Sequence, residues 1–218
     1  MLIKIVHKRR KTRRRPADLR RLLRYLFTPK LSRDPLPSPP RLLGPPVLHR
    51  LVTSTLPWGP GVDKAAADLT EQMVDYCRDA RAGLDMPETW YVHMIFSFSP
   101  KASPALRDPP DGHVAPPPSH SQSANALRVV FDALDFLGWD PLQPGVFVCH
   151  GDRRHIHVHA VIVRPVEGGG LWDIMRMSRK QLWEIAQIST DVFGLPGVGR
   201  TAAQHQGRWL AFEHRDEV

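Results

Sequence analysis

Two apolar segments separated by a short polar turn constrain the fold of this chain more than any other feature. Residues 146–149 and 156–163 are rich in valine and isoleucine, and the sequence Gly-Asp-Arg-Arg stands at 151–154 between them. Branched residues favour strands, and two such runs joined by a short turn are typical of a β-hairpin. This part of the sequence therefore predicts two neighbouring strands.

Other segments have the periodicity of helices and strands. Apolar residues at helical spacing predict helices over residues 17–27, 62–82 and 124–137, and Ser178 is a good N-cap for a last helix that ends near Phe193. Branched and aromatic residues predict strands over residues 2–6 and 90–98. Neighbouring strands with interspersed helices favour an α+β fold, with a central, largely antiparallel sheet flanked by helices, over a doubly wound parallel fold.

Proline-rich stretches predict long loops within a single domain. The 218 residues suit one domain over residues 1–218, and nine of the 22 prolines lie in residues 29–60 and six in residues 101–123. No apolar run approaches the roughly 20 residues needed to cross a bilayer, so no membrane insertion is expected. Two cysteines cannot form a disulfide framework, and Cys149 lies in an apolar run where a buried thiol is expected. These features favour a cytoplasmic protein.

Positive charge is concentrated at the N-terminal end. Residues 1–33 hold 13 of the 30 lysines and arginines and only one acidic residue, whereas the remaining residues carry a small excess of acidic side chains. Such a block is either a solvated basic tail or a segment that binds a polyanion such as a nucleic-acid backbone. If the segment binds a nucleic acid such as DNA, the basic residues expected to contact it are Lys8, Arg9, Arg10, Lys11, Arg13, Arg14, Arg15 and Arg24.

Four of the 11 histidines fall between positions 150 and 159. Side chains two apart on a strand point to the same side, so His157 and His159 share one face while the alternate apolar residues face a core. A hairpin turn at 151–154 would bring His150 back beside them. Three imidazoles with open coordination positions are typical of a catalytic metal site, although an isolated His-x-His is more often a polar strand surface.

Two further polar residues of this segment have weaker assignments. Asp152 either orients an imidazole as its hydrogen-bond acceptor or is an ordinary turn residue, because Gly-Asp is common in turns. His155 has the same parity as His157 but lies at the entrance of the strand. We therefore treat His155 as a supporting residue.

The pattern His150-x-Asp152-x-x-His155-x-His157-x-His159 resembles the third motif of conjugative relaxases, the mobilisation class that includes plasmid mobilisation proteins and the T-DNA border endonuclease. The strand-forming residues 94–98 before it, and Gly170-Leu171-Trp172 with Ser178-Arg179 after it, are also similar to that family. Relaxases of this type carry a tyrosine on a helix near the N-terminus, where this chain has Tyr25.

The resemblance also has gaps. The family usually has an asparagine four residues beyond the last motif histidine, and this chain has Val163 there. The second family motif is not recognisable, and the proline-rich stretches 29–60 and 101–123 match no part of the family pattern. The resemblance is ordered along most of the chain and is tight only around the histidines.

The resemblance implies an HUH relaxase-like fold and an endonuclease that nicks single-stranded DNA at a plasmid or mobile-element transfer origin. Tyr25 would attack the scissile phosphodiester and become joined to the 5′-phosphate, and Asp152 would orient His150 or help to accept the phenolic proton. His150, His157 and His159 would hold a divalent ion, Mn²⁺, Mg²⁺ or Zn²⁺. Implied partners are the transfer-origin DNA, accessory relaxosome proteins and a type IV secretion coupling protein.

Two other functions remain open from the sequence. A DNA-binding or replication-initiation module could keep the same fold without cleaving DNA, and a metal-dependent hydrolase could use an activated water in place of a tyrosine. Replacement of Tyr25 by Phe distinguishes the first alternative, because only a relaxase would lose cleavage while it keeps binding. The second alternative predicts no covalent protein–DNA adduct.

Overall fold

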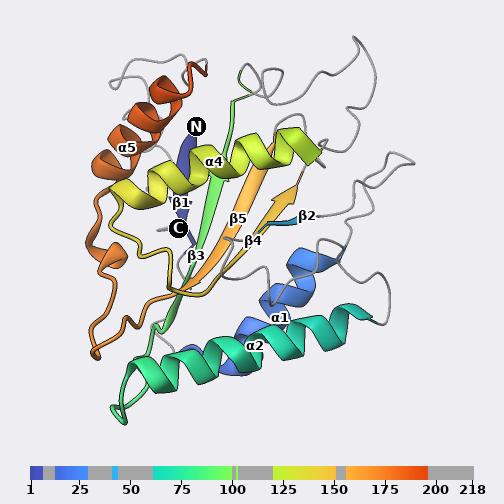
Figure 1. The fold of residues 1–218 in the computed structure, drawn as a ribbon, viewed down its shortest axis with the longest axis vertical. Helices are drawn as coiled ribbons and strands as arrows, with labels where there is room; N and C mark the ends of the chain where they lie inside the picture. Colours follow the sequence, from blue (N-terminus) through green and yellow to red (C-terminus); the bar gives the residue numbers. More distant parts are fainter. Residues whose placement is uncertain are drawn as a thin grey trace, which may run out of the picture.

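The structure is a computed structural model that describes residues 1–6, 13–28, 41–43, 61–99, 102, 120–150 and 156–195. Within these residues the chain forms an α+β fold, in which helices flank one antiparallel sheet (Figure 1). The predicted fold class and the antiparallel character of the sheet are therefore confirmed.

Five strands of the described residues form the sheet, in the order β1-β3-β5-β4-β2. Their bounds are β1 (Leu2–Ile5), β2 (Arg41–Leu43), β3 (Tyr91–Ser97), β4 (Gly145–His150) and β5 (His157–Val163). Each neighbouring pair is antiparallel. β5 is the central strand, with β3 on one side and β4 on the other.

β4 and β5 pair as the predicted hairpin. Their register runs from Gly145 opposite Ile162 to His150 opposite His157. Every residue of both strands is buried, because helices cover the sheet on both sides. Residues 151–155, which connect the two strands, lie outside the described residues.

β2 is an element that the sequence pattern does not predict. Residues 41–43 lie within the proline-rich stretch 29–60, yet they pair with β4 at the edge of the sheet. Prolines stand directly before this segment and two residues after it. A proline cannot donate a hydrogen bond to a sheet ladder, so only a short edge strand fits between them. The rest of 29–60 and most of 101–123 lie outside the described residues.

The predicted helices are confirmed with small shifts at their ends. The bounds are α1 (Pro16–Phe27), α2 (Gly61–Ala80), α4 (His120–Phe136) and α5 (Arg179–Val192), with a short 3₁₀ helix η2 (Ile174–Arg176) before α5. α4 begins four residues before the predicted start, because residues 120–123 carry no apolar side chain that would reveal its first turn. Ser178 caps α5 as predicted, and its Oγ accepts the N–H of Gln181 at 3.2 Å.

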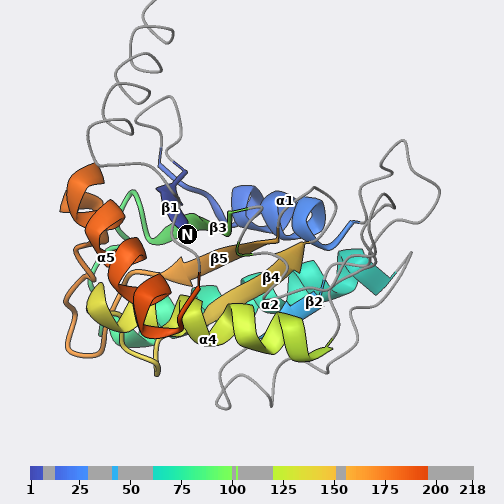
Figure 2. The same ribbon diagram turned by 90° about the horizontal axis from the view of Figure 1, so that it is seen from above.

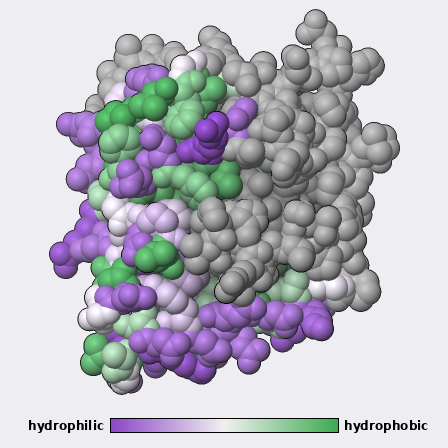
Figure 3. Space-filling view, in the orientation of Figure 1, coloured by the Kyte–Doolittle hydropathy of each residue, from purple (hydrophilic) through white to green (hydrophobic). Residues whose placement is uncertain are grey.

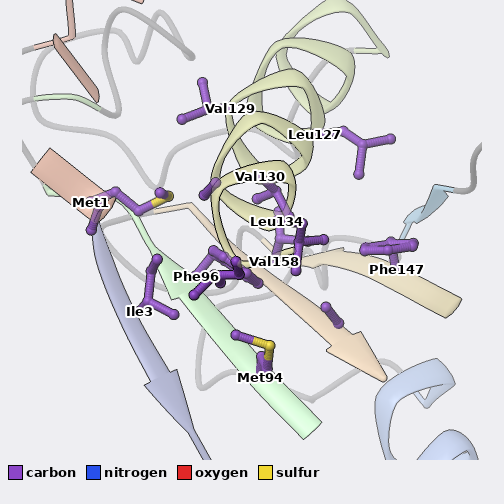
Figure 4. Close-up of a cluster of buried hydrophobic side chains, with 14 of the residues drawn as sticks. Met1, Ile3, Met94, Phe96, Leu127, Val129, Val130, Leu134, Phe147 and Val158 are labelled. Carbon is purple, nitrogen blue, oxygen red and sulfur yellow. The ribbon is translucent and has the colours of Figure 1, made fainter. Parts of the chain in front are cut away.

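The helices lie in two layers, one on each face of the sheet (Figures 1 and 2). α4 and α5 cover one face, and α1 and α2 cover the other. Under α4, Val130 and Leu134 pack near Phe96, Phe147 and Val158 of the sheet (Figure 4). Cys149 belongs to the same cluster and is a free, buried thiol, as predicted.

α1 and α2 pack against the opposite face through apolar stripes. α1 buries Leu19, Leu23, Leu26 and Phe27, and α2 contributes a stripe that includes Leu69. The outer side of α2 is hydrophilic along the lower edge of the molecule in Figure 3. None of the described helices combines the length and the apolar composition that crossing a membrane requires.

Candidate metal centre

The alternation of β5 places two histidines on the face that α1 and α2 cover. Val158, Ala160 and Ile162 belong to the apolar cluster beneath α4 and α5. His157 and His159 therefore face the opposite side of the sheet, as the sequence predicts. These two histidines are 6% and 5% exposed, so they are not the solvated strand surface that was the alternative interpretation.

The hairpin supplies the third histidine. His150 is the last residue of β4 and pairs directly with His157 across the two strands. One nitrogen atom of each of the three rings can be chosen so that all three lie within 4.8 Å of one another. The nitrogen ligands of one ion lie about 3 to 4 Å apart, so small ring movements would suffice for the three imidazoles to share an ion. The three histidines form a buried group that could bind a metal ion.

A backbone carbonyl of α1 fixes the tautomer of His150. The Nε2 atom of His150 lies 3.1 Å from the carbonyl oxygen of Leu26, near the C-terminal end of α1. A carbonyl oxygen only accepts hydrogen bonds, so Nε2 carries the proton and donates it. In the neutral form of the ring the lone pair is at Nδ1, which is the nitrogen that would coordinate a metal. The contact also ties the histidine group to α1.

His93 is part of this site, although the sequence reasoning did not select it. Its Nε2 atom lies 2.9 Å from Nδ1 of His159, and the two rings are stacked with centroids 5.2 Å apart. His93 is on β3, whose alternate residues Val92, Met94 and Phe96 face the α4 side. The parity of the predicted strand 90–98 therefore already placed His93 on the histidine face, and this was the signal that could have found it.

The environment of His93 favours its neutral form. Burial lowers the pKa of His93 to about 4, and the positive charge of Arg14 acts in the same direction. At pH 7 the ring is therefore uncharged and has one N–H and one acceptor nitrogen. Such a ring can accept a hydrogen bond from His159 without placing a second positive charge beside a bound metal ion.

Tyr25 is on α1, directly before the residue that bonds His150. Its side chain is 53% exposed, unlike the buried leucines of the same helix. Tyr25 and His93 both line a pocket of about 400 Å³, whose walls are Val6, Arg14, Asp18, Arg21, Leu22, Tyr25, Tyr91 and His93. The predicted nucleophile and the histidine group are thus connected in two ways, through the Leu26 carbonyl and through His93.

Arg14 is a predicted DNA contact that the fold places in the interior. It is 6% exposed, and its guanidinium donates to the carbonyl oxygen of Tyr91 at 2.8 Å and stacks over the Tyr91 ring at 4.5 Å. The backbone of Arg14 is held as well, since Trp90 donates its indole N–H to the carbonyl oxygen of Arg14 at 2.8 Å and the N–H of Arg14 donates to the carbonyl oxygen of Glu88 at 2.8 Å. Arg14 therefore anchors the start of α1 to β3, which sets the position of Tyr25.

The other described basic residues of this region are exposed. Arg13 and Arg15 are at the surface before and at the start of α1, and Arg24 forms an ion pair with Asp63 of α2. Arg21, which was not among the predicted DNA contacts, lines the same pocket as Tyr25 one helical turn away. The remaining predicted site residues lie outside the described residues: Lys8, Arg9, Arg10, Lys11, Asp152 and His155.

The donor set found in the described residues consists of imidazoles alone. Three such ligands would leave coordination positions of an ion open to water, to a substrate or to a further ligand, whereas structural zinc sites have four protein ligands and usually include cysteines. Cys149 is next to His150 in sequence but faces the α4 side of the sheet, so it does not join the group. No family model matches this sequence, and neither a curated protein nor a solved structure matches the chain.

Proposed function

We propose that this protein is a metal-dependent relaxase, which nicks single-stranded DNA at a transfer origin by tyrosine transesterification. The observation that carries the proposal is the packing of α1 on the histidine face. Tyr25 precedes Leu26, whose carbonyl oxygen accepts from His150, one of three buried histidines that could bind one ion. The proposal is thus supported by Tyr25, the candidate metal site and the exposed arginines of α1, which lie on the same face of the sheet.

In the proposed reaction, Tyr25 replaces one phosphoester bond of the DNA with a bond from phosphorus to its own phenolic oxygen. The phenolic oxygen of Tyr25 attacks the scissile phosphorus, the bond from phosphorus to the 3′ oxygen breaks, and the 3′ oxygen takes up the proton that the phenol released and leaves as a free 3′-hydroxyl. A tyrosine nucleophile must lose its phenolic proton as it attacks, so a nearby base must accept that proton. We assign that role to Asp152, which follows His150 by two residues. The phosphotyrosyl bond stores the energy for religation, and no nucleotide cofactor is needed.

A divalent ion held by His150, His157 and His159 would polarise a non-bridging phosphate oxygen and stabilise the charge of the transition state. Imidazole ligands suit Zn²⁺, whereas Mn²⁺ and Mg²⁺ prefer oxygen ligands and would fit here where phosphate oxygens share their coordination. The burial of the three rings excludes water from most of their surface, which strengthens electrostatic interactions at the site.

The exposed arginines of α1 and the preceding segment support DNA as the substrate. Arg13, Arg15 and Arg24 can pair with phosphates along the strand, and Arg21 is close enough to Tyr25 to bind a phosphate beside the nucleophile. Binding of this kind weakens steeply as salt rises. The proposed setting is the cytoplasm, where relaxosome proteins and a type IV secretion coupling protein would act with the nicked strand.

The test is denaturing gel electrophoresis after the protein is incubated with labelled single-stranded DNA from the transfer-origin region of its own genetic element. We expect a band of covalent protein–DNA adduct that requires Mn²⁺ or Mg²⁺ and disappears in Tyr25→Phe and His157→Ala. Tyr76→Phe is the matched control, because Tyr76 is a partly buried tyrosine of α2 outside the site and its substitution should leave the adduct intact.

The other outcomes identify the alternative functions. Salt-sensitive binding without any cleavage would replace the relaxase with a non-cleaving DNA-binding or replication-initiation module. Metal-dependent cleavage that leaves no adduct and survives in Tyr25→Phe would identify a hydrolase that uses an activated water. A scrambled oligonucleotide of the same composition separates cleavage at a site from general nuclease activity.

A further inference from the structure

The bond between His93 and His159 joins the candidate metal site to a strand that the histidine motif does not include. His93 is on β3 and pairs across the sheet with Val161, two residues beyond His159 on β5. Its ring is nevertheless turned toward His159, with Nε2 at 2.9 Å from Nδ1. Diagonal neighbours on one face of an antiparallel pair are within reach of long side chains, so the register permits this contact.

The contact determines which nitrogen of His159 a metal can bind. A neutral imidazole has one N–H and one lone pair, and a metal takes the lone pair. When Nδ1 of His159 carries the proton and donates it to His93, the lone pair of His159 is at Nε2. The Leu26 carbonyl fixes His150 in the same way, with the opposite nitrogen left for the metal.

We propose that His93 is a positioning residue, which accepts a hydrogen bond from Nδ1 of His159 and holds that ring with Nε2 ready to bind a divalent cation. Partners of this kind are usually carboxylates, backbone carbonyls or water, and an imidazole fills the position here. The inference rests on the metal site of the proposed function, but it requires neither DNA cleavage nor the role of Tyr25.

The burial of the pair makes the bond important for the geometry of the site. His93 is 8% exposed and His159 is 5% exposed, so water has little access to replace a lost partner. The stacked arrangement, with an angle of 25° between the rings, also limits the rotation of His159 about its Cβ–Cγ bond. Without His93, the ring of His159 could reorient or adopt the other tautomer, and metal affinity would fall.

The experiment measures Co²⁺ binding to the full chain after treatment with a chelator, by calorimetry and by the visible absorption of bound Co²⁺. Loss of a partner that orients a ligand typically weakens metal binding about 10- to 100-fold. We expect His93→Phe to show a loss of this size and a changed absorption spectrum. We expect His93→Gln to stay within about threefold of the wild type, because its amide oxygen can accept the same hydrogen bond.

Two further variants separate positioning from a general loosening of the sheet. Val161→Ala removes the cross-strand neighbour of His93 and lowers stability without touching the hydrogen bond, so its Co²⁺ affinity and spectrum should match the wild type. His93→Asn keeps a polar side chain that is one methylene shorter than Gln and should bind Co²⁺ as weakly as His93→Phe. If the Phe variant does not fold, the comparison of Asn with Gln decides the question.

Each result is assigned to one of the two hypotheses. Wild-type affinity and spectrum in both His93→Phe and His93→Asn would overturn the positioning role and leave the metal site standing. Equal weakening of Co²⁺ binding in His93→Gln and Val161→Ala would overturn the positioning role too, since the loss of affinity would then follow from altered packing. Absence of Co²⁺ binding in the wild type itself would instead contradict the proposed metal site and remove the basis of the inference.

Discussion

The same strands form both faces of the central sheet, but the two faces carry different kinds of side chain. On the face beneath α4 and α5, the described side chains of β3 and β5 are apolar from one end to the other. On the face beneath α1 and α2, β5 begins with His157 and His159 and continues with Val161 and Val163. The change from polar to apolar occurs within one strand and one layer.

This difference separates the residues that stabilise the fold from the residues that form the candidate site. Burying an imidazole is unfavourable compared with burying a valine, unless its nitrogens find partners. Among the described residues, this cost falls on one face of the sheet, at His93 of β3, His150 of β4, and His157 and His159 of β5, beside the C-terminal end of α1. The apolar half of the same face and the whole opposite face supply the stability that offsets it.

The largest change in the free energy of unfolding should come from a substitution on the wholly apolar face. Phe96→Ala removes a fully buried ring from the cluster beneath α4, and such truncations cost about 3–5 kcal/mol. Urea unfolding followed by circular dichroism measures this change in the free energy of unfolding. Ser97→Ala is the matched control, because the next residue of β3 points to the other face and is only partly buried. A loss below about 1 kcal/mol in Phe96→Ala would contradict the assignment of this face as the core.

The next largest change in the free energy of unfolding should come from metal binding at the histidine end of the other face. A ligand that binds only the folded state at 100 times its dissociation constant stabilises it by about 2.7 kcal/mol. We expect Mn²⁺ or Zn²⁺ at such a concentration to raise the free energy of unfolding of the wild type by this amount, and a chelator to reverse the gain. His157→Ala should show no gain, whereas Phe96→Ala should keep it. Equal stabilisation of wild type and His157→Ala would place metal binding elsewhere.

Much of this division could be predicted from the sequence. Period-two alternation in 90–98 and 156–163 assigned the core face, and the short turn at 151–154 predicted that His150 returns beside His157, because both inferences depend on local geometry alone. His93 had the right parity but lies 66 residues from His159, so its partner depended on the strand order β3-β5. The Leu26 carbonyl and the burial of Arg14 depend on how α1 docks, which no local pattern in the sequence encodes.

A smaller change in the free energy of unfolding, of opposite sign, tests whether the buried histidines reduce stability. Replacement of His157 by Leu fills a buried position with an apolar side chain, and we expect the metal-free protein to become more stable by about 1 kcal/mol, since sites for function commonly reduce stability. The same variant should lose the stabilisation by Mn²⁺ or Zn²⁺. Urea unfolding in the presence of a chelator measures the first change. Destabilisation by more than about 1 kcal/mol would mean that the imidazole contributes to the fold as well as to the site.

The smallest effect on stability should accompany the largest effect on activity. The Tyr25 side chain is 53% exposed on α1, and substitutions at exposed positions usually change the free energy of unfolding by less than about 0.5 kcal/mol. Tyr25→Phe should therefore unfold at the wild-type urea concentration and bind Co²⁺ with wild-type affinity, while the covalent DNA adduct disappears because the nucleophilic oxygen is gone. A large loss of stability or of Co²⁺ affinity would mean that the phenol supports the histidine group. Tyr25 would then belong to the structure of the site rather than to its chemistry alone.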